Sequence, residues 1–302
     1  KKQKRKLTAF ITASALTVIL GVSGLVCNVM ATRVNNNNYE TLVSPSVATS
    51  LEDKVSSYEQ AIKIYPNRIE AYTCMLEAYE DEGKFGKKEN DEFLALYNAH
   101  KDNFDVTSKE YAELNYKIGM MYFNYYTNDD GSYSFSNRVQ KAYSFFATNF
   151  ENKEISSEFE YKKLSDCYYR ICSFYKTYIL SSATVEEASR DNYEELISTI
   201  ENALDDVKDA GAYDQLTLYN GTFMLLYDQR SSMVQVNVDK STVLALLDRV
   251  YNSANTLSVK KEQSQNLQKE IIDNYDEYKE AIERAYTNAE ERADINAEKE
   301  TK

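Results

Sequence analysis

Residues 58–85 read YEQAIKIYPNRIEAYTCMLEAYEDEGKF. On both sides of the Pro66-Asn67 pair, apolar side chains recur three or four positions apart, which is the spacing of one helix face. Proline cannot continue a helix, and proline followed by asparagine is typical of a turn. The stretch therefore predicts two helices joined by a short connection.

The same helical spacing continues outward from this stretch. Helices are predicted over residues 51–65, 68–83, 89–101, 107–126, 136–149, 156–180, 185–209, 212–230, 240–256 and 259–292. The chain has only 2 prolines and 8 glycines among 302 residues. Because an all-β fold needs many tight turns, this composition predicts an all-α fold.

The quoted stretch also has an ordered set of aromatic and small positions. Its first helix ends with an aromatic residue, a small residue and a proline: Tyr58, Ala61 and Pro66. Its second helix and the turn after it carry Ala71, Tyr72, Met75, Tyr79, Gly83 and Phe85. These positions resemble tetratricopeptide repeats, which pair two antiparallel helices within about 34 residues. Looser versions follow around Tyr116 and Tyr168, so the resemblance implies a tetratricopeptide-like solenoid of stacked hairpins over residues 51–293.

The resemblance also implies which side chains face the inner groove of such a solenoid. They are Glu77, Glu80, Asp81, Tyr116, Met120, Phe123, Asn124, Tyr169 and Ser173. A groove lined by acids and aromatic rings suits an extended protein or peptide ligand, or a cell-wall polymer. The alternative for each aromatic residue is packing in the core.

The last predicted helix has one apolar stripe and a charged back. The stripe consists of Leu267, Ile271, Tyr275, Tyr278, Ile282 and Tyr286. This pattern is typical of a helix that caps a helical array. A dimerising coiled coil is the alternative, although tyrosine fits heptad holes poorly. Residues 294–302 are predicted to be a disordered tail.

The N-terminal segment from Leu7 to Thr32 carries no charged side chain and is long enough to span a bilayer as a helix. Residues 1–6 read KKQKRK, and this basic flank predicts a cytoplasmic N-terminus with the main domain outside, in a single-pass membrane protein. The alternatives are a cleaved signal peptide ending near Ala31 and a lipoprotein modified at Cys27. The asparagine-rich residues 33–50 are predicted to be a flexible linker.

The charges are distributed unevenly along the chain, which has a net charge of −13. Residues 1–33 hold six basic and no acidic side chains, so 29 basic and 48 acidic side chains remain for the rest. An acidic body repels nucleic acid and anionic lipid. We therefore expect neutral or basic partners and no nucleic acid.

No catalytic, cofactor or metal site is predicted. The sequence lacks the phosphate-binding, dinucleotide-binding, zinc-protease and serine-hydrolase motifs. His100 is the only histidine, and Cys167 and Cys172 are not spaced as a CxxC pair. Residues 128–132 are predicted to be a connecting loop, with a cation site as the alternative. The Asn220-Gly221-Thr222 sequon falls inside a predicted helix.

The order of basic segment, membrane helix, asparagine-rich linker and outer repeats resembles the C-terminal half of bacterial eukaryotic-like serine/threonine kinases. This resemblance implies a non-catalytic sensor or protein-binding domain, with a kinase preceding Lys1. One alternative is a stand-alone envelope scaffold that recruits wall or secretion machinery. Another is a helical glycan-active enzyme that uses a carboxylate pair.

Overall fold

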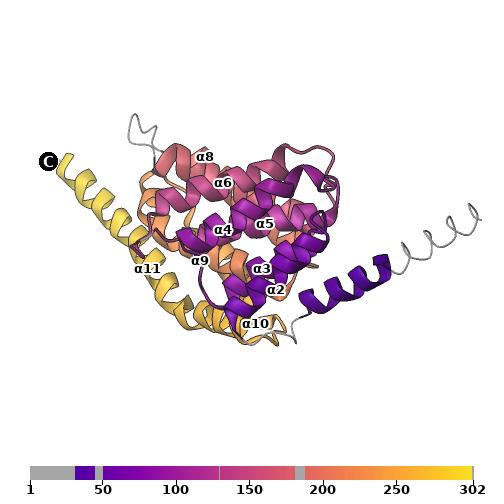
Figure 1. Ribbon diagram of the computed structural model, residues 1–302. Coiled ribbons are helices and arrows are strands. Elements are labelled where there is room, and N and C mark those ends of the chain that lie inside the picture. The colour runs from indigo at the N-terminus through magenta and orange to yellow at the C-terminus, as the bar shows by residue number, and fades with distance from the viewer. Residues whose placement is uncertain (1–30, 45–49, 129, 181–187, 301–302) are drawn as a thin grey trace, which may run out of the picture. The chain divides into compact units, whose positions relative to one another are not determined.

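The computed structural model describes residues 31–44, 50–128, 130–180 and 188–300 (Figure 1). Within these ranges the chain is helical apart from its connections, and the β pairing consists of one isolated bridge between Gly86 and Thr127. The predicted all-α class is therefore confirmed.

The helices follow the predicted ranges closely, with boundaries shifted by a few residues at most ends. They are α2 (Leu51–Ile64), α3 (Glu70–Asp81), α4 (Lys87–His100), η1 (Lys101–Asn103), α5 (Lys109–Asn124), α6 (Phe135–Glu151), α7 (Glu160–Phe174), η2 (Tyr175–Ile179), α8 (Arg190–Asp206), α9 (Ala212–Gln235), α10 (Lys240–Thr256) and α11 (Glu262–Glu300).

Local capping explains where many of these helices begin. The residue before the helix accepts a hydrogen bond from a backbone N–H in the first turn at Ser50, Ser108, Ser134, Ser189 and Asp239. Each such bond satisfies a donor that the helix itself leaves unpaired. These starts are therefore set by the sequence next to them and do not depend on the rest of the fold.

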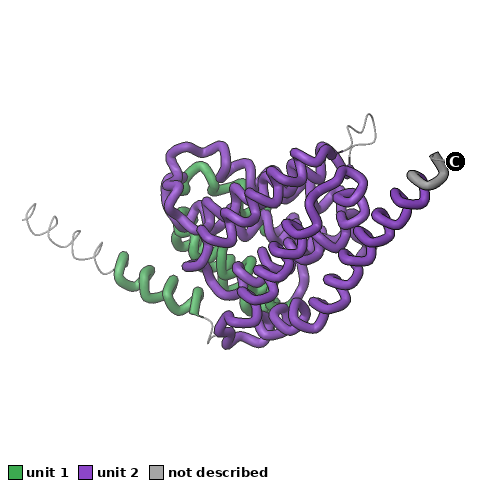
Figure 2. Tube along the Cα trace, turned by 180° about the vertical axis from the view of Figure 1, so that it is seen from behind, with its two compact units in different colours: residues 1–82, 93–104 green, residues 83–92, 105–302 purple. Residues whose placement is uncertain are grey.

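The contacts divide the chain into two compact units (Figure 2). Unit 1 comprises residues 1–82 and 93–104, and unit 2 comprises residues 83–92 and 105–302. The prediction placed residues 51–293 in a single domain. The boundary between the units runs through α4: its first turn and a half belongs to unit 2 and its second half to unit 1.

Unit 1 is held by aromatic packing around α3. The ring of Tyr72 meets Phe93 and Phe104 edge-on, with centroids 6.5 and 5.2 Å apart. Edge-to-face pairs of this kind stabilise beyond the area they bury. The second half of α4 and the segment after it are thereby joined to α3.

The predicted flexible linker over residues 33–50 is wrong for its first part, because residues 31–43 are helical. Tyr39 is fully buried there, and Val43, four positions later, is 7% exposed. The Arg68 guanidinium lies over the Tyr39 ring at 4.6 Å and over Tyr65 at 4.5 Å. These cation–π contacts within unit 1 explain why an asparagine-rich segment is ordered.

In unit 2, α5, α6 and α7 pack in succession, while α9, α10 and α11 pack on one another. Gly119 allows α5 to approach α6 closely, since a Cβ added there would lie 2.4 Å from the Phe146 ring. We call the packed interface of α5, α6 and the first half of α7 the seam.

Helix α11 packs on α9 and α10 through the predicted stripe, with Ile271 and Ile282 fully buried. The Tyr286 hydroxyl donates to the Val238 carbonyl at 3.0 Å. The predicted disordered tail is wrong for residues 294–300, because α11 continues to Glu300 (Figure 1). Its last turns are rich in alanine and glutamate, which are good helix formers.

Nowhere in the described residues does a helix combine the length and apolar character needed to cross a bilayer. The predicted membrane helix, Leu7 to Thr32, lies outside the described residues except for its last two positions, as does the basic flank at residues 1–6. Both remain predictions.

Candidate ligand-binding cavity

Unit 2 contains a cavity of about 760 Å³, formed by α5, α6, α7, η2, α9, α11 and the connection before α6. Pockets of this size hold small ligands or inserted side chains. Seven of the lining residues are aromatic: Phe123, Tyr125, Tyr133, Phe135, Tyr168, Tyr175 and Tyr213.

The aromatic rings of the cavity hold one another in place. Phe135 meets Tyr175 edge-on, with centroids 5.0 Å apart, and Phe123 meets Phe135 and Tyr168 at 6.2 and 5.7 Å. The Tyr125 and Tyr213 hydroxyls are 2.6 Å apart. Because each ring is braced by a neighbour, the wall is formed in advance of any ligand.

Exposed apolar side chains gather at this cavity. Seven large hydrophobic side chains are exposed within the described ranges, and four of them line it: Tyr133, Phe135, Ile179 and Met224, at 63, 39, 37 and 38% exposure. Single exposed apolar residues are ordinary on protein surfaces, whereas a contiguous group at a concave site marks a place where something binds.

The charged side chains of the cavity are one arginine and two acids. The Arg138 Nε donates to the Tyr126 carbonyl at 2.9 Å, and the guanidinium lies over the Tyr133 ring at 4.1 Å. Burial lowers the pKa of Arg138. Asp228 on α9 and Glu270 on α11 supply the carboxylates. Burial raises the pKa of Asp228, and nearby Arg230 opposes this shift.

Tyr168 forms part of the inner wall, where its hydroxyl is buried. It makes no hydrogen bond to any residue that the structure describes. Burial raises its pKa well above the usual value, so the hydroxyl stays protonated and remains a donor. Gly221 lies next to it, since a Cβ added at Gly221 would be 3.6 Å from the hydroxyl.

Helix α7 changes its winding where it reaches the cavity. Residues 175–179 form the π-helical turn η2, and the Leu180 N–H donates to the Tyr175 carbonyl at 2.8 Å. Tyr175 and Ile179 in this turn both line the cavity. Such turns are frequent at functional sites. The sequence predicted an uninterrupted helix here and did not reveal the change.

The residues predicted to line one groove do not form one surface. Phe123 and Asn124 line the large cavity. Tyr169 and Ser173 line a separate cavity of about 220 Å³ formed by α7, η2 and α8. Adjacent positions on α7 point to different sides of the helix. One side faces α8 and the smaller cavity, and the other faces α9 and the large cavity.

Tyr116 and Met120 were predicted to line the groove, and the structure corrects this. They are 1 and 5% exposed, so they belong to the core of unit 2. The Tyr116 ring contacts Tyr161 and Tyr168, with centroids 5.4 and 6.2 Å apart, because α7 packs directly on this face of α5. The predicted acids Glu77, Glu80 and Asp81 lie in unit 1, at the C-terminal end of α3.

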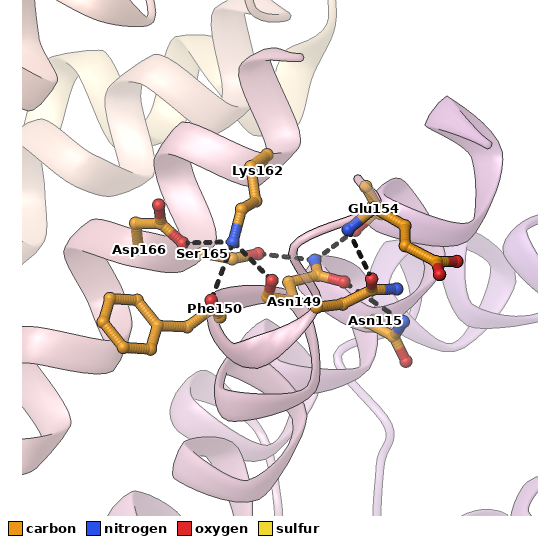
Figure 3. Close-up of polar contacts among 9 residues, drawn as sticks. Asn115, Asn149, Phe150, Glu154, Lys162, Ser165 and Asp166 are labelled. Carbon is orange, nitrogen blue, oxygen red and sulfur yellow. Dashed lines mark hydrogen bonds and ion pairs between the residues drawn. The ribbon is translucent and has the colours of Figure 1, made fainter. Parts of the chain in front are cut away.

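A buried polar cluster in the seam was not predicted (Figure 3). Lys162 on α7 is 6% exposed, and its ammonium donates to the Asn149 carbonyl, to the Phe150 carbonyl at 3.1 Å and to Asp166 at 3.0 Å. An ammonium has three donors, and here each has an acceptor. Lys162 thus satisfies two carbonyls at the C-terminal end of α6.

The same cluster continues between α5 and α6. The Asn149 amide donates to the Ala112 carbonyl at 2.7 Å and to the Ser165 hydroxyl at 2.8 Å, and it accepts from Asn115 at 3.2 Å. Internal pairing of this kind indicates a structural role. The only sequence signal was a polar residue inside an apolar stripe, as at Asn115.

Other motifs raised by the sequence are accounted for by structure. Thr222 of the sequon is 1% exposed and donates to the Leu218 carbonyl at 2.9 Å, while Asn220 is half-buried and lines the large cavity. Asp130 accepts from the Ser132 N–H at 2.9 Å, as in a connecting turn. Burial raises the pKa of the Cys167 thiol to about 12. The described ranges contain no group of three or more His, Cys, Asp or Glu residues placed to hold a metal ion.

Comparisons with protein-family models, with curated proteins and with solved structures find no match to this chain. Its function therefore has to be inferred from the cavity and from the sequence.

Proposed function

We propose that this chain is the binding or sensor part of a membrane-anchored extracytoplasmic protein, and that the cavity of unit 2 binds a segment of a partner protein. The observation that carries this proposal is the gathering of exposed Tyr133, Phe135, Ile179 and Met224 around a cavity with braced aromatic walls. Covering this exposed apolar surface with a partner removes it from water, which favours binding.

A protein segment suits the site because its apolar lining continues outward to exposed side chains. A partner could insert one or two side chains and lay its backbone over Tyr133 and Met224. Interfaces obtain most of their affinity from a few such anchors in pockets. The polar groups of the cavity are suited to binding and not to proton transfer. Arg138 is held in place by the Tyr126 carbonyl and the Tyr133 ring, and the Tyr168 hydroxyl keeps its proton.

The remaining parts of the proposal rest on the sequence. The uncharged segment Leu7 to Thr32 after a basic flank supports the membrane anchor and an outer location for the helical body. Helices α2 and α3 lie where the tetratricopeptide-like residues occur, which supports stacked hairpins as the architecture. The order of segments supports a place after the kinase of a larger signalling protein.

The test uses the full chain in lipid nanodiscs and a fluorescein-labelled twelve-residue peptide of alternating phenylalanine, leucine and serine. Fluorescence anisotropy measures its dissociation constant. We expect the double substitution Ile179→Ser with Met224→Ser to weaken binding about tenfold, because two apolar contacts at the cavity are lost.

Val106→Ser is the matched control, since Val106 is 38% exposed like Met224 but does not line the cavity. It should leave the affinity unchanged. Equal weakening by the control and the double variant, or no binding by the unsubstituted chain, would refute the proposal.

A further inference from the structure

We infer that the partner segment is basic as well as apolar, and that a lysine or arginine side chain of this segment enters the cavity toward Asp228 and Glu270. This inference rests on the proposed function, because it assigns the chemistry of the ligand to the same cavity. Three features support it: the Asp228 carboxylate without a bonded partner, the aromatic rings of the cavity, and the excess of acidic side chains after residue 33.

The described lining of the cavity has more acidic than basic side chains. Asp228 and Glu270 are two carboxylates, and Arg138 is the single basic residue among the lining side chains that the structure describes. Arg138 is held by the neutral Tyr126 carbonyl and Tyr133 ring and keeps its charge, so one net negative charge remains among these three side chains. In the described part of the chain no hydrogen bond or ion pair joins the Asp228 carboxylate to another residue, and Arg230 acts on it only through space, so an incoming cation would meet an available acceptor.

Aromatic faces add to this preference for a cation. The cavity brings the rings of Tyr133, Phe135 and Tyr175 into the same space as Asp228. A ring attracts a cation placed over its face, and more strongly when water is excluded. The chain already holds its own cations this way, with Lys176 over Tyr143 at 3.6 Å and Arg230 over Tyr227 at 4.1 Å.

The shape and chemistry of lysine and arginine fit the whole site. Their long apolar stems pack along hydrophobic walls while the charged head reaches a polar group. The apolar mouth residues Ile179 and Met224 would contact the stem or its neighbours, and the carboxylates on α9 and α11 would meet the head. An acidic ligand would instead bring its charge against Asp228.

The net negative charge of the chain after residue 33 also favours a basic partner at long range. After residue 33 the chain has 29 basic and 48 acidic side chains. Such a surface attracts a basic segment and speeds its association, and added salt weakens the effect.

The experiment compares three fluorescein-labelled twelve-residue peptides on the full chain in nanodiscs of uncharged phosphatidylcholine. All three keep the same phenylalanine and leucine positions, and the positions between them are lysine, serine or glutamate. We expect the lysine peptide to bind about tenfold more tightly than the serine peptide, and the glutamate peptide to bind most weakly.

Asp228→Asn then distinguishes attraction by the cavity from attraction by the acidic surface as a whole. We expect this variant to bring the lysine peptide within about twofold of the serine peptide, while the serine peptide keeps its affinity. Glu270→Gln should act in the same direction. Glu290→Gln is the control, because it removes one carboxylate from the same helix about 30 Å further along and should leave the preference intact.

The outcomes separate this inference from the proposed function. Equal binding of the lysine and serine peptides, or tighter binding of the glutamate peptide, overturns the inference and leaves a cavity that binds apolar segments. Equal loss for all three peptides in Asp228→Asn, or the same loss in Glu290→Gln, also overturns it. If no peptide binds, or if Ile179→Ser with Met224→Ser has no effect on any peptide, the proposed function fails.

Discussion

The two halves of helix α7 lie in contrasting surroundings. In the first half, Lys162 and Ser165 are buried in the seam and their polar groups are bonded to α6 (Figure 3). In the second half, Tyr168 and Ile171 line the cavity, and the Tyr168 hydroxyl has no partner among the described residues. A region that satisfies its own polar groups is closed, whereas a concave region with exposed apolar surface is suited to a ligand.

Two helical glycines show the same contrast. A Cβ at Gly119 in the seam would lie 2.4 Å from Phe146, whereas a Cβ at Gly221 beside the cavity would lie 3.6 Å from Tyr168. The first distance is far below a normal contact, and the second is an ordinary one. Substitutions at the two sites should therefore have different effects on the free energy of unfolding.

The largest effect is expected for Gly119→Ala. The added methyl group forces Phe146 or the α5 backbone to move, so we expect the free energy of unfolding to fall by about 2–3 kcal/mol. Urea denaturation followed by far-ultraviolet circular dichroism measures this change. An unchanged midpoint would mean that α5 and α6 are not in close contact at this point.

Lys162→Met should be the next largest change. It keeps the apolar stem but leaves two α6 carbonyls without their donor, so we expect a loss of about 2 kcal/mol in the same measurement. The control is Lys163→Met, whose ammonium lies 3.5 Å from Asp206 at the surface. Surface pairs contribute about 0–1 kcal/mol, so equal losses at both positions would refute a special role for Lys162.

Gly221→Ala should have the opposite sign from Gly119→Ala. Alanine favours the helical conformation, and the space beside Tyr168 accepts a methyl group, so we expect unfolding to cost about 0.5–1 kcal/mol more. Thermal unfolding of the two alanine variants side by side makes the comparison. Destabilisation at Gly221 would show that the cavity wall is as tightly packed as the seam.

The smallest change is expected for Tyr168→Phe. Because the deleted hydroxyl has no described partner, the free energy of unfolding should stay the same or rise by up to about 1 kcal/mol. Tyr122→Phe is the control, since the Tyr122 hydroxyl donates to Asn90 and its removal should cost about 1 kcal/mol. A loss at Tyr168 that matches the loss at Tyr122 would contradict the unpaired state of its hydroxyl.

Most helix positions could be predicted from the sequence, because they depend on neighbouring residues. Apolar spacing and capping side chains such as Ser108 and Asp239 act within a few positions of the helix they start. The prediction failed at residues 33–43, where a polar run concealed Tyr39. Tyr39 is held by Arg68 and Tyr65, which are distant in sequence.

Only part of the cavity could be predicted. Phe123 and Asn124 were identified on α5, whereas Tyr116 on the same helix is covered by α7. Asp228 on α9 and Glu270 on α11 carried no local signal, because each resembles the other exposed acids of its helix. Only the folded chain shows that these two acids line the same cavity, because the helices that enclose it are far apart in sequence.

Spacing, capping side chains and composition are local properties, and they were enough to predict the all-α class, the positions of most helices and the excess of acidic side chains after residue 33. Which aromatic residues pack in the seam and which line a cavity could be read only from the folded chain. Burial and the pairing of polar groups depend on what a facing helix supplies: α6 supplies carbonyl acceptors to Lys162, whereas the Tyr168 hydroxyl on the same helix has no partner among the described residues.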